Sequence, residues 1–183
     1  YWLAIERELV PFSALLADLG EAVPQRQVLV ALESLRHRML IERGPDRLTF
    51  TLQPIILEFL TDQLVDALYQ EIMNGQPNLL HRHAFVQATA KEYVRHSQEQ
   101  LIARPLLERM VGACGDADAL ERQLLMLLAS WREQALIQQG YGPGNVINLL
   151  RLRRGHLRDL DLSRVAIQQA YLQGLDVQDT NLV

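Results

Sequence analysis

The sequence predicts a mainly α-helical fold, with one small β-hairpin in its first third and a five-residue repeat at its C-terminal end. Three observations lead to this prediction. Apolar residues recur at helical spacing through most of the chain, apolar and polar residues alternate over 48–52, and a spacing of five begins after Gly155. With 183 residues, of which 49% are apolar, the chain can bury the core of one large domain or of two small ones.

The first forty residues contain signals for three helices. Apolar residues at positions 1–5, followed by polar ones, indicate the tail of a helix whose start is missing. Ser13 is a suitable N-cap for a short helix that Gly20 ends. A longer helix follows Pro24, because four apolar residues then recur at spacings of four, three and four. They are Val28, Leu32, Leu35 and Met39.

The helical spacing then gives way to a β-hairpin. Residues 40–43 and the alternating segment 48–52 flank the turn sequence Gly44-Pro45-Asp46. Pro54 closes the hairpin and suits the first turn of the next helix. Helix, helix, hairpin, helix is the order of a winged-helix domain, so we expect residues 1–70 to form one.

Residues 71–154 are expected to form a helical linker bundle. Pro105 lacks a backbone donor and indicates a break or kink near Ala103, so the second of the four helices is either separate or a continuation of the first. Asp118 is expected to cap the third helix. The four predicted helices cover residues 80–96, 98–111, 119–137 and 145–152.

The C-terminal segment has a period of five, which neither one α-helix nor one flat strand explains. Leucine, isoleucine or valine recurs at every fifth residue from 157 to 182, and a second small or apolar residue lies two positions before each of them. A chain that turns a corner every five residues would bury both columns along one axis. The predicted core positions are Leu157, Leu162, Ile167, Leu172, Val177 and Leu182.

Residues 155–183 resemble the pentapeptide-repeat family, whose units read small, Asp/Asn, Leu/Phe, Ser/Thr/Arg, Gly. Gln168 and Tyr171 depart from this pattern. The resemblance implies the start of a right-handed β-solenoid with four units per coil. Since each coil buries its face only against another coil or a cap, we expect the preceding helices to cap one end and the natural protein to continue past Val183. The best matches are residues 161–163, 170–174 and 181–182.

Nearly the whole chain resembles the region after the nucleotide-binding core of bacterial STAND-class signalling ATPases, which have NB-ARC-type ATPase modules. Similar proteins carry WD-repeat propellers or longer pentapeptide solenoids downstream. The resemblance implies a truncated winged helix at residues 1–70, a linker bundle at 71–154 and a truncated solenoid at 155–183. The segments that carry it are residues 1–7, 32–35, 40–42, 50–54 and 170–174.

The same resemblance implies a non-catalytic role in coupling. In such proteins the winged helix packs on the ATPase core, and a histidine after the hairpin contacts the bound ADP. Gln53 occupies that position here, and it can donate a hydrogen bond but cannot titrate near neutral pH. This chain has no Gly-rich phosphate loop, so ADP or ATP with Mg²⁺ is expected only in a longer parent protein.

The expected partners are an upstream ATPase domain and a downstream repeat domain of the same protein, together with other proteins of the bacterial cytoplasm. No apolar run reaches the roughly 18 residues of a membrane span. The paired His81 and His83 lack the further ligands that a metal site needs, and Cys114 lacks a neighbouring base. We therefore expect no metal, cofactor or catalytic residue in this chain.

Two other functions stay open at this point. One is a DNA-binding regulator, which the net charge of −4 and the excess of acids over arginines in residues 1–70 disfavour. The other is an adaptor that binds proteins through the solenoid. The candidate DNA contacts are Gln25, Arg26, Gln27, Arg36, His37, Arg38, Arg43 and Arg47.

A basic stretch lies where the helices meet the repeat. It is either a solvated face whose charges pair with Asp159 and Asp161, which we favour, or a docking patch for an acidic segment of another domain. The residues of this arginine cluster are Arg151, Arg153, Arg154 and Arg158.

Overall fold

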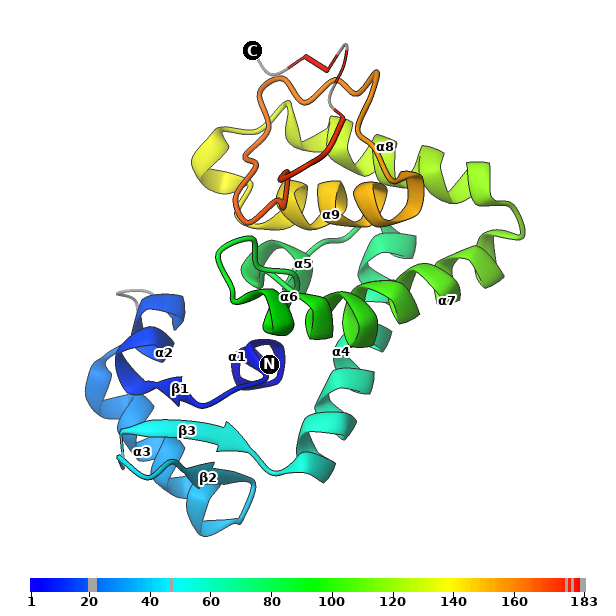
Figure 1. Cartoon of the computed structure of the whole chain (residues 1–183). Helices are drawn as coiled ribbons and strands as arrows, with labels where there is room; N and C mark the ends of the chain where they lie inside the picture. Colours follow the sequence, from blue (N-terminus) through cyan, green and yellow to red (C-terminus); the bar gives the residue numbers. More distant parts are fainter. Residues whose placement is uncertain (20–22, 47, 177, 179, 182–183) are drawn as a thin grey trace. The chain divides into compact units, whose positions relative to one another are not determined.

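The computed structural model is mainly helical, with one three-stranded antiparallel sheet (Figure 1). The chain divides into two compact units, residues 1–63 and residues 64–183. The residues that the structure describes are 1–19, 23–46, 48–176, 178 and 180–181.

In its described residues, the first unit contains three helices, the sheet and the start of a fourth helix. The strand order is β1-β3-β2, and Val10 pairs with Phe50 while Ile41 pairs with Leu52. The elements are α1 (Trp2–Glu6), β1 (Val10–Pro11), α2 (Phe12–Leu19), α3 (Gln25–His37), β2 (Ile41–Arg43), β3 (Thr49–Leu52) and α4 (Pro54–Asn74).

The predicted hairpin is confirmed, and its alternation sets the core of the first unit. Phe50 and Leu52 are buried, whereas the threonines of β3 are half-buried. The turn is held by Asp46, whose Oδ1 accepts the N–H groups of Leu48 (3.1 Å) and Thr49 (3.0 Å). β1 was not predicted, because a two-residue strand leaves no period in the sequence.

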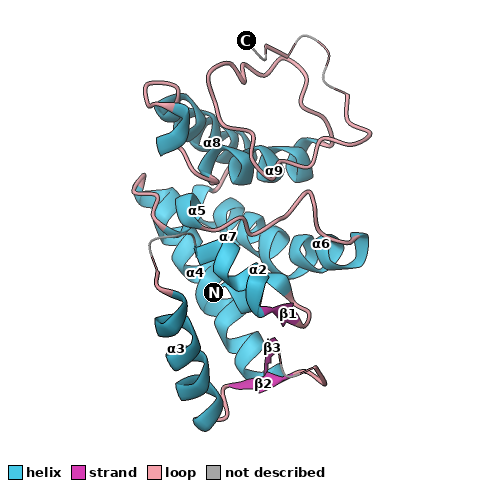
Figure 2. Ribbon diagram, turned by 90° about the vertical axis from the view of Figure 1, so that its left-hand side faces the viewer, coloured by secondary structure: helices cyan, strands magenta, loops and turns pink. Residues whose placement is uncertain are grey.

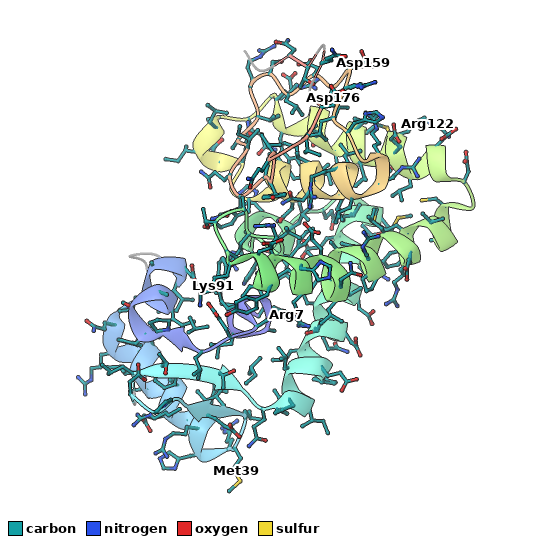
Figure 3. All side chains as sticks on the ribbon, in the orientation of Figure 1. Arg7, Met39, Lys91, Arg122, Asp159 and Asp176 are labelled. Atoms are coloured by element: carbon teal, nitrogen blue, oxygen red, sulfur yellow. The ribbon has the colours of Figure 1, made fainter. Side chains whose placement is uncertain are left out.

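Two predictions for this unit are wrong. Ser13 does not cap α2, because the helix already begins at Phe12, whose N–H donates to the carbonyl of Leu48 at 2.9 Å. Met39 does not continue the apolar face of α3. The helix ends at His37, and Met39 takes a left-handed φ of 56° and is 73% exposed at the surface (Figure 3). Val28 and Leu32 are buried as expected.

The second unit is a helical body with the repeat segment packed on its last two helices (Figure 2). Contacts join α7 to α8, α8 to α9, and α5 to α9. Its elements, after the end of α4, are α5 (Leu79–Arg82), α6 (Glu92–Gln98), the π-helical η1 (Glu99–Ala103), α7 (Arg104–Cys114), α8 (Ala117–Trp131), the 3₁₀-helical η2 (Leu136–Gln138) and α9 (Gly142–Arg154).

The helix predicted over 80–96 is wrong, because α5 is a single turn and residues 83–91 are irregular. The irregular backbone is satisfied by buried side chains instead of by its own helical bonds. The side-chain oxygen of Asn145 accepts the N–H of Phe85 (3.2 Å), and that of Gln98 accepts the N–H of Gln87 (2.9 Å). Such long-range bonds override local helix propensity.

The predicted break near Ala103 is a π-helical turn between α6 and α7. It ends just before Pro105, which lies in the first turn of α7 and has no N–H to give. The helix therefore continues past the proline, which was one of the two arrangements expected.

The third predicted helix has different ends. Asp116, not Asp118, caps α8, and its Oδ1 accepts the N–H of Asp118 at 3.0 Å. The helix stops at Trp131 instead of continuing to residue 137. The side-chain amide of Gln139 donates to the carbonyl oxygen of Trp131 (2.9 Å) and so satisfies one of the groups that a helix end leaves open.

The repeat segment turns at every fifth residue. Left-handed φ values of 57°, 55°, 58° and 70° occur at Asp159, Arg164, Gln169 and Gly174. After four such corners the chain returns to its own backbone, because Asp161 forms an isolated parallel bridge with Asn181. We call this turn of the chain, residues 157–176, the coil, or the first coil where the residues that follow it are also discussed. Apart from this bridge, residues 155–176 contain no strand, and Figure 2 shows the C-terminal segment as loop on one side of α8 and α9.

The predicted core positions of the repeat are not equally buried. Leu157 and Leu162 are buried, Leu172 is half-buried, and Ile167 is 42% exposed. Val177 and Leu182 lie outside the described residues. Leu160 and Val165 supply the rest of the buried column, so the part of the coil nearest its start carries the core.

Gly144 allows the closest approach between α9 and the repeat. A Cβ at this position would overlap the backbone oxygen of Gln168. We expect Gly144→Ala to lower the free energy of unfolding by about 1–3 kcal/mol, as overpacking does. Urea denaturation measures the change.

Gly112 in α7 is the matched control for this substitution. A Cβ there would meet nothing within 4 Å, so Gly112→Ala should raise stability by up to about 1 kcal/mol through helix propensity alone. Equal effects of the two substitutions would contradict a close contact at Gly144.

Candidate functional site

The best-defined candidate site is the junction between the helices and the repeat segment in the second unit. We call it the helix–repeat junction and define it as residues 136–154, which contain η2 and α9, together with residues 157–171. Three fully buried amide side chains lie in it, which is unusual because a buried amide is costly unless its donors and acceptor are satisfied. They are Gln139, Asn145 and Asn148.

Gln139 joins the end of α8 to the repeat. Its Nε2 donates to the carbonyl oxygen of Arg164 (2.9 Å) as well as to Trp131, and its Oε1 accepts the N–H of Ala166 at 2.7 Å. One side chain therefore holds a helix end and one corner of the coil together.

Asn148 makes an equivalent connection one repeat later. Its Oδ1 accepts the N–H of Tyr171 (2.9 Å), and its Nδ2 donates to the carbonyl of Gln169 (3.0 Å) and, more weakly, to that of Val86 (3.4 Å). Because Val86 belongs to the irregular segment 83–91, Asn148 fixes that segment and the coil at once.

Asn145 binds the backbone of α5 and of the irregular segment. Its Nδ2 donates to the carbonyls of Leu80 (2.8 Å) and His83 (2.7 Å), while its oxygen accepts from Phe85. The three amides together satisfy backbone groups that no helix or strand satisfies.

Tyr171, which departs from the pentapeptide pattern, packs against the helices. Its ring centroid lies 3.8 Å from the guanidinium of Arg95 and 5.1 Å from that of Arg151, which are cation–π distances. The aromatic side chain thus fastens the coil to α6 and α9. The two contacts account for the large side chain at this position.

The arginine cluster is paired within the second unit. Arg151 pairs with Glu99, Arg158 pairs with Asp176, and the partners predicted for the cluster, Asp159 and Asp161, are not the ones observed. Figure 3 shows Asp159 and Asp176 on the repeat segment. These pairs leave the cluster little free charge for docking an acidic segment.

Glu121 of α8 forms ion pairs with the remaining two arginines of the cluster, and Asp118 also pairs with one of them, Arg153, at 3.7 Å. The carboxylate of Glu121 accepts from Nε of Arg153 (3.1 Å) and of Arg154 (2.8 Å), both in α9. The hydrogen bond from Arg154 and the two positive charges hold the pKa of Glu121 below its usual range. Glu121 therefore binds α8 to α9 as a carboxylate at neutral pH.

The first unit contains an apolar groove of about 770 Å³. It lies between α1, α2, α3 and the start of α4, and the sheet contributes residues from β2 and β3. Aromatic and aliphatic side chains make up nearly all of its lining, among them Trp2, Leu15, Leu32, Ile56 and Phe59.

Gln53, the predicted nucleotide-sensing position, lies between β3 and α4 and is half-buried. Its N–H donates to the carbonyl of Leu40 at 3.4 Å, and its own carbonyl accepts the N–H of Leu57 at 2.8 Å. Its backbone therefore closes the hairpin and opens α4, so its position is fixed by both elements.

The candidate DNA surface is partly neutralised. Glu33 of α3 forms ion pairs with Arg36 and with Arg43 of β2. Two of the predicted phosphate contacts are thus occupied by one carboxylate, and the side chain of Arg47 lies outside the described residues. This pairing further disfavours binding to a phosphate backbone.

The described part of the chain contains neither a cluster of metal ligands nor a membrane-spanning helix. In the described ranges, His, Cys, Asp and Glu side chains nowhere gather in threes or more as a metal ion would need. Of the helices that the structure describes, none combines the length and the apolar content that crossing a bilayer requires.

An uncharacterized WD repeat-containing protein of Nostoc sp. (strain PCC 7120) is 30% identical to this chain over 214 aligned residues. The similarity covers 99% of the chain but 17% of that protein, so the chain spans less than a fifth of the relative's length. No protein-family model matches the sequence. No solved structure matches it either.

The amides of the junction were missed at the sequence level, although one signal was present. Asn145 and Asn148 are three apart in a stretch whose other members, residues 146, 147, 149 and 150, are all apolar. Polar residues on an apolar helix face indicate buried hydrogen bonds. Gln139 gives no such signal, because polar and Gly residues surround it.

We expect Glu121→Gln to lower the free energy of unfolding by about 1–2 kcal/mol at pH 7, since two guanidinium groups lose their carboxylate. The ion pairs stabilise the fold above the usual pKa of a glutamate. Their contribution is lost as the pH falls through the lowered pKa of Glu121.

The control for Glu121 is Glu133→Gln, an exposed position just after α8, which should change stability by less than about 0.5 kcal/mol. Urea denaturation at several pH values compares the two. A loss for Glu121→Gln that does not become smaller as the pH is lowered would contradict the ion-pair explanation.

Asp18 gives the first unit a pH dependence of the opposite sign. Burial, together with the nearby charge of Glu6, raises the pKa of Asp18 from 3.8 to about 6. Because the folded state disfavours its ionised form, stability should fall as the pH rises from 4 to 6. Asp18→Asn should therefore stabilise the first unit by about 1 kcal/mol at pH 7 and have little effect at pH 4.

Urea denaturation followed by NMR signals of the first unit tests this expectation. The exposed Glu58→Gln in α4 serves as the control. Equal stabilisation by Asp18→Asn at pH 4 and pH 7 would show that the ionisation of Asp18 is not its cause.

Proposed function

We propose that this chain is the winged-helix and linker region of a STAND-class signalling ATPase, and that it couples the nucleotide-binding core to a C-terminal repeat domain. The observation that carries the proposal is the order of parts: a small α/β unit, a helical body, and a coil with five-residue corners held on that body. The role is regulatory, and the chain itself is not proposed to catalyse a reaction.

The topology of the first unit supports a winged helix. The elements follow the order α1-β1-α2-α3-β2-β3-α4, and the hairpin β2-β3 is completed by β1 in the order β1-β3-β2. A third strand that pairs with the hairpin is the arrangement expected of a winged helix. The pairing of Glu33 with Arg36 and Arg43 supports a domain that packs against protein in preference to DNA.

The geometry of the repeat supports the start of a pentapeptide solenoid. Corners five residues apart and a parallel bridge between Asp161 and Asn181 agree with a coil of four units. The bonds from Leu157 N–H to Asp176 (3.0 Å) and from Leu162 N–H to Asn181 (2.8 Å) begin a second coil on the first.

The relative supports placement within a multidomain protein. That protein is much longer than this chain, and its name gives it WD repeats. WD-repeat propellers are among the downstream domains that the STAND resemblance predicts. A downstream sensor domain, an upstream ATPase binding ADP or ATP with Mg²⁺, and a cytoplasmic location are parts of the same proposal.

Coupling of this kind requires that the two nucleotide states contact the first unit differently. The apolar groove and the half-buried Gln53 are the features through which the first unit would meet the ATPase core. α4 belongs to both units, since it extends from Pro54 to Asn74 across the boundary at residue 63. It is the covalent route by which a change in the first unit reaches the second.

The test uses the full-length protein. We expect Gln53→Ala to speed ADP release by about fivefold or more, since allosteric coupling energies are typically about 1–3 kcal/mol. Gln53→His should restore slow release because an imidazole also donates a hydrogen bond. Stopped-flow release of a fluorescent ADP analogue, together with the steady-state ATPase rate, measures both.

Gln25→Ala, at the exposed start of α3, is the matched control and should leave ADP release unchanged. A deletion of residues 1–63 provides the decisive comparison. If ADP retention and ATPase rate are the same with and without these residues, the coupling role is wrong.

A further inference from the structure

The amides of Gln139 and Asn148 contact the coil in the same way. Gln139 binds the carbonyl before residue 165 and the N–H after it, which belong to Arg164 and Ala166. Asn148 binds the carbonyl of Gln169 and the N–H of Tyr171, which flank residue 170. The two bound positions are five residues apart, so the two amides contact equivalent points of successive repeats.

The backbone of Asn181, which follows the first coil, also binds one carbonyl and one N–H that flank a single residue of that coil. Asn181 donates its N–H to the carbonyl of Leu160 (3.0 Å), and its own carbonyl accepts the N–H of Leu162 (2.8 Å). These groups flank Asp161, with which Asn181 forms the parallel bridge. In a parallel ladder, one residue bonds in this way to the two neighbours of its partner.

We propose that residues 136–154, which contain η2 and α9, form a cap that recognises the backbone geometry of the coil. In this cap the side-chain amides of Gln139 and Asn148 take the place of two peptide groups of a preceding coil. The cap fits one kind of partner: an extended segment that turns every five residues, here residues 157–171 of the same chain. This inference is independent of the proposed ATPase role, since it rests on contacts within the second unit alone.

The chemistry of the two side chains suits this task. A primary amide has a carbonyl acceptor and N–H donors in one plane, as a peptide group has, and Asn and Gln are the two side chains that carry it. Both are fully buried, so water does not compete for the four coil groups that they bind.

Gly144 adds a close backbone contact between the cap and the coil. Its missing Cβ lets the backbone oxygen of Gln168 lie directly against α9, between the two corners that the amides bind. Neither this contact nor the amide bonds involve a side chain of the coil. Recognition should therefore tolerate changes of the coil's outward residues.

The first test is Gln139→Glu in the full chain, with the exposed neighbour Gln138→Glu as the control. At pH 7 a carboxylate still accepts from Ala166, but it cannot donate and it faces the carbonyl of Arg164. We expect amide exchange over residues 157–171 to accelerate by about tenfold or more, because buried acceptors are left unsatisfied. Residues 1–63 should keep their protection, as should the whole chain in Gln138→Glu.

The pH dependence of the Gln139→Glu variant distinguishes the loss of a hydrogen-bond donor from a general loss of folded structure. Protonation of the introduced carboxylate restores one donor, so the protection factors of residues 157–171 should recover as the pH is lowered. Protection that stays low at every pH, or that is lost equally across the second unit and the first, would overturn the proposal.

Arg164→Gly is the complementary test. It removes an exposed side chain and keeps the left-handed backbone that this corner needs, since glycine adopts it freely. We expect exchange over residues 157–171 to stay within about twofold of the wild type. Loss of protection as large as that of Gln139→Glu would mean that the cap reads side chains, and the proposal would be wrong.

Discussion

The second unit depends on hydrogen bonds between buried side-chain amides and backbone that forms neither helix nor sheet. An unsatisfied buried peptide group costs about 1–3 kcal/mol, which is a large share of the stability of a small domain. Residues 83–91 and the first coil together contain many such groups. Asn145 and Asn148 from α9 and Gln139 from the loop before it satisfy several of them. These residues therefore help to determine where the irregular segment and the coil pack.

Charge reinforces this arrangement from the outside. The arginines at the end of α9 pair with carboxylates of η1 and α8, so that both elements are tied to the same helix. Arg158 and Asp176 form a further pair within the repeat segment. Exposed ion pairs contribute little individually. Here the pair between Arg151 and Glu99 is mostly buried, with 12% and 14% of the side chains exposed, and it lies beside the stacked ring of Tyr171. α9 is thus the element to which most of the second unit is attached.

The sequence predicted what local periodicity determines. The alternation in β3, the buried face of α3 at Val28 and Leu32, and the five-residue corners all follow from residue spacing. It failed where distant residues compete with local preference. The helix predicted over 80–96 is broken because Asn145, some sixty residues later, binds the backbone at Phe85. Met39 fits the helical spacing but lies after the end of the helix. There the N–H of Leu40 donates to the carbonyl of Leu35 at 3.0 Å, and this hydrogen bond closes the last turn. The backbone bond at the helix end outweighs the burial of one more apolar side chain. The pairing of the arginine cluster was misassigned for the same reason, since Glu99 and Glu121 are close only in the folded chain.

The two hydrogen-bonding edges of the capped coil differ. Along residues 164–171 the edge that faces α9 has its carbonyl and N–H groups occupied by amides, so a second chain cannot add to it as a strand. The opposite edge is the one on which Asn181 already begins the next layer. Stacking on this unit can therefore proceed from a single side, and two copies cannot join through their capped faces. Two amide side chains thereby leave the repeat with one edge that is closed to further strands and one edge that can be extended.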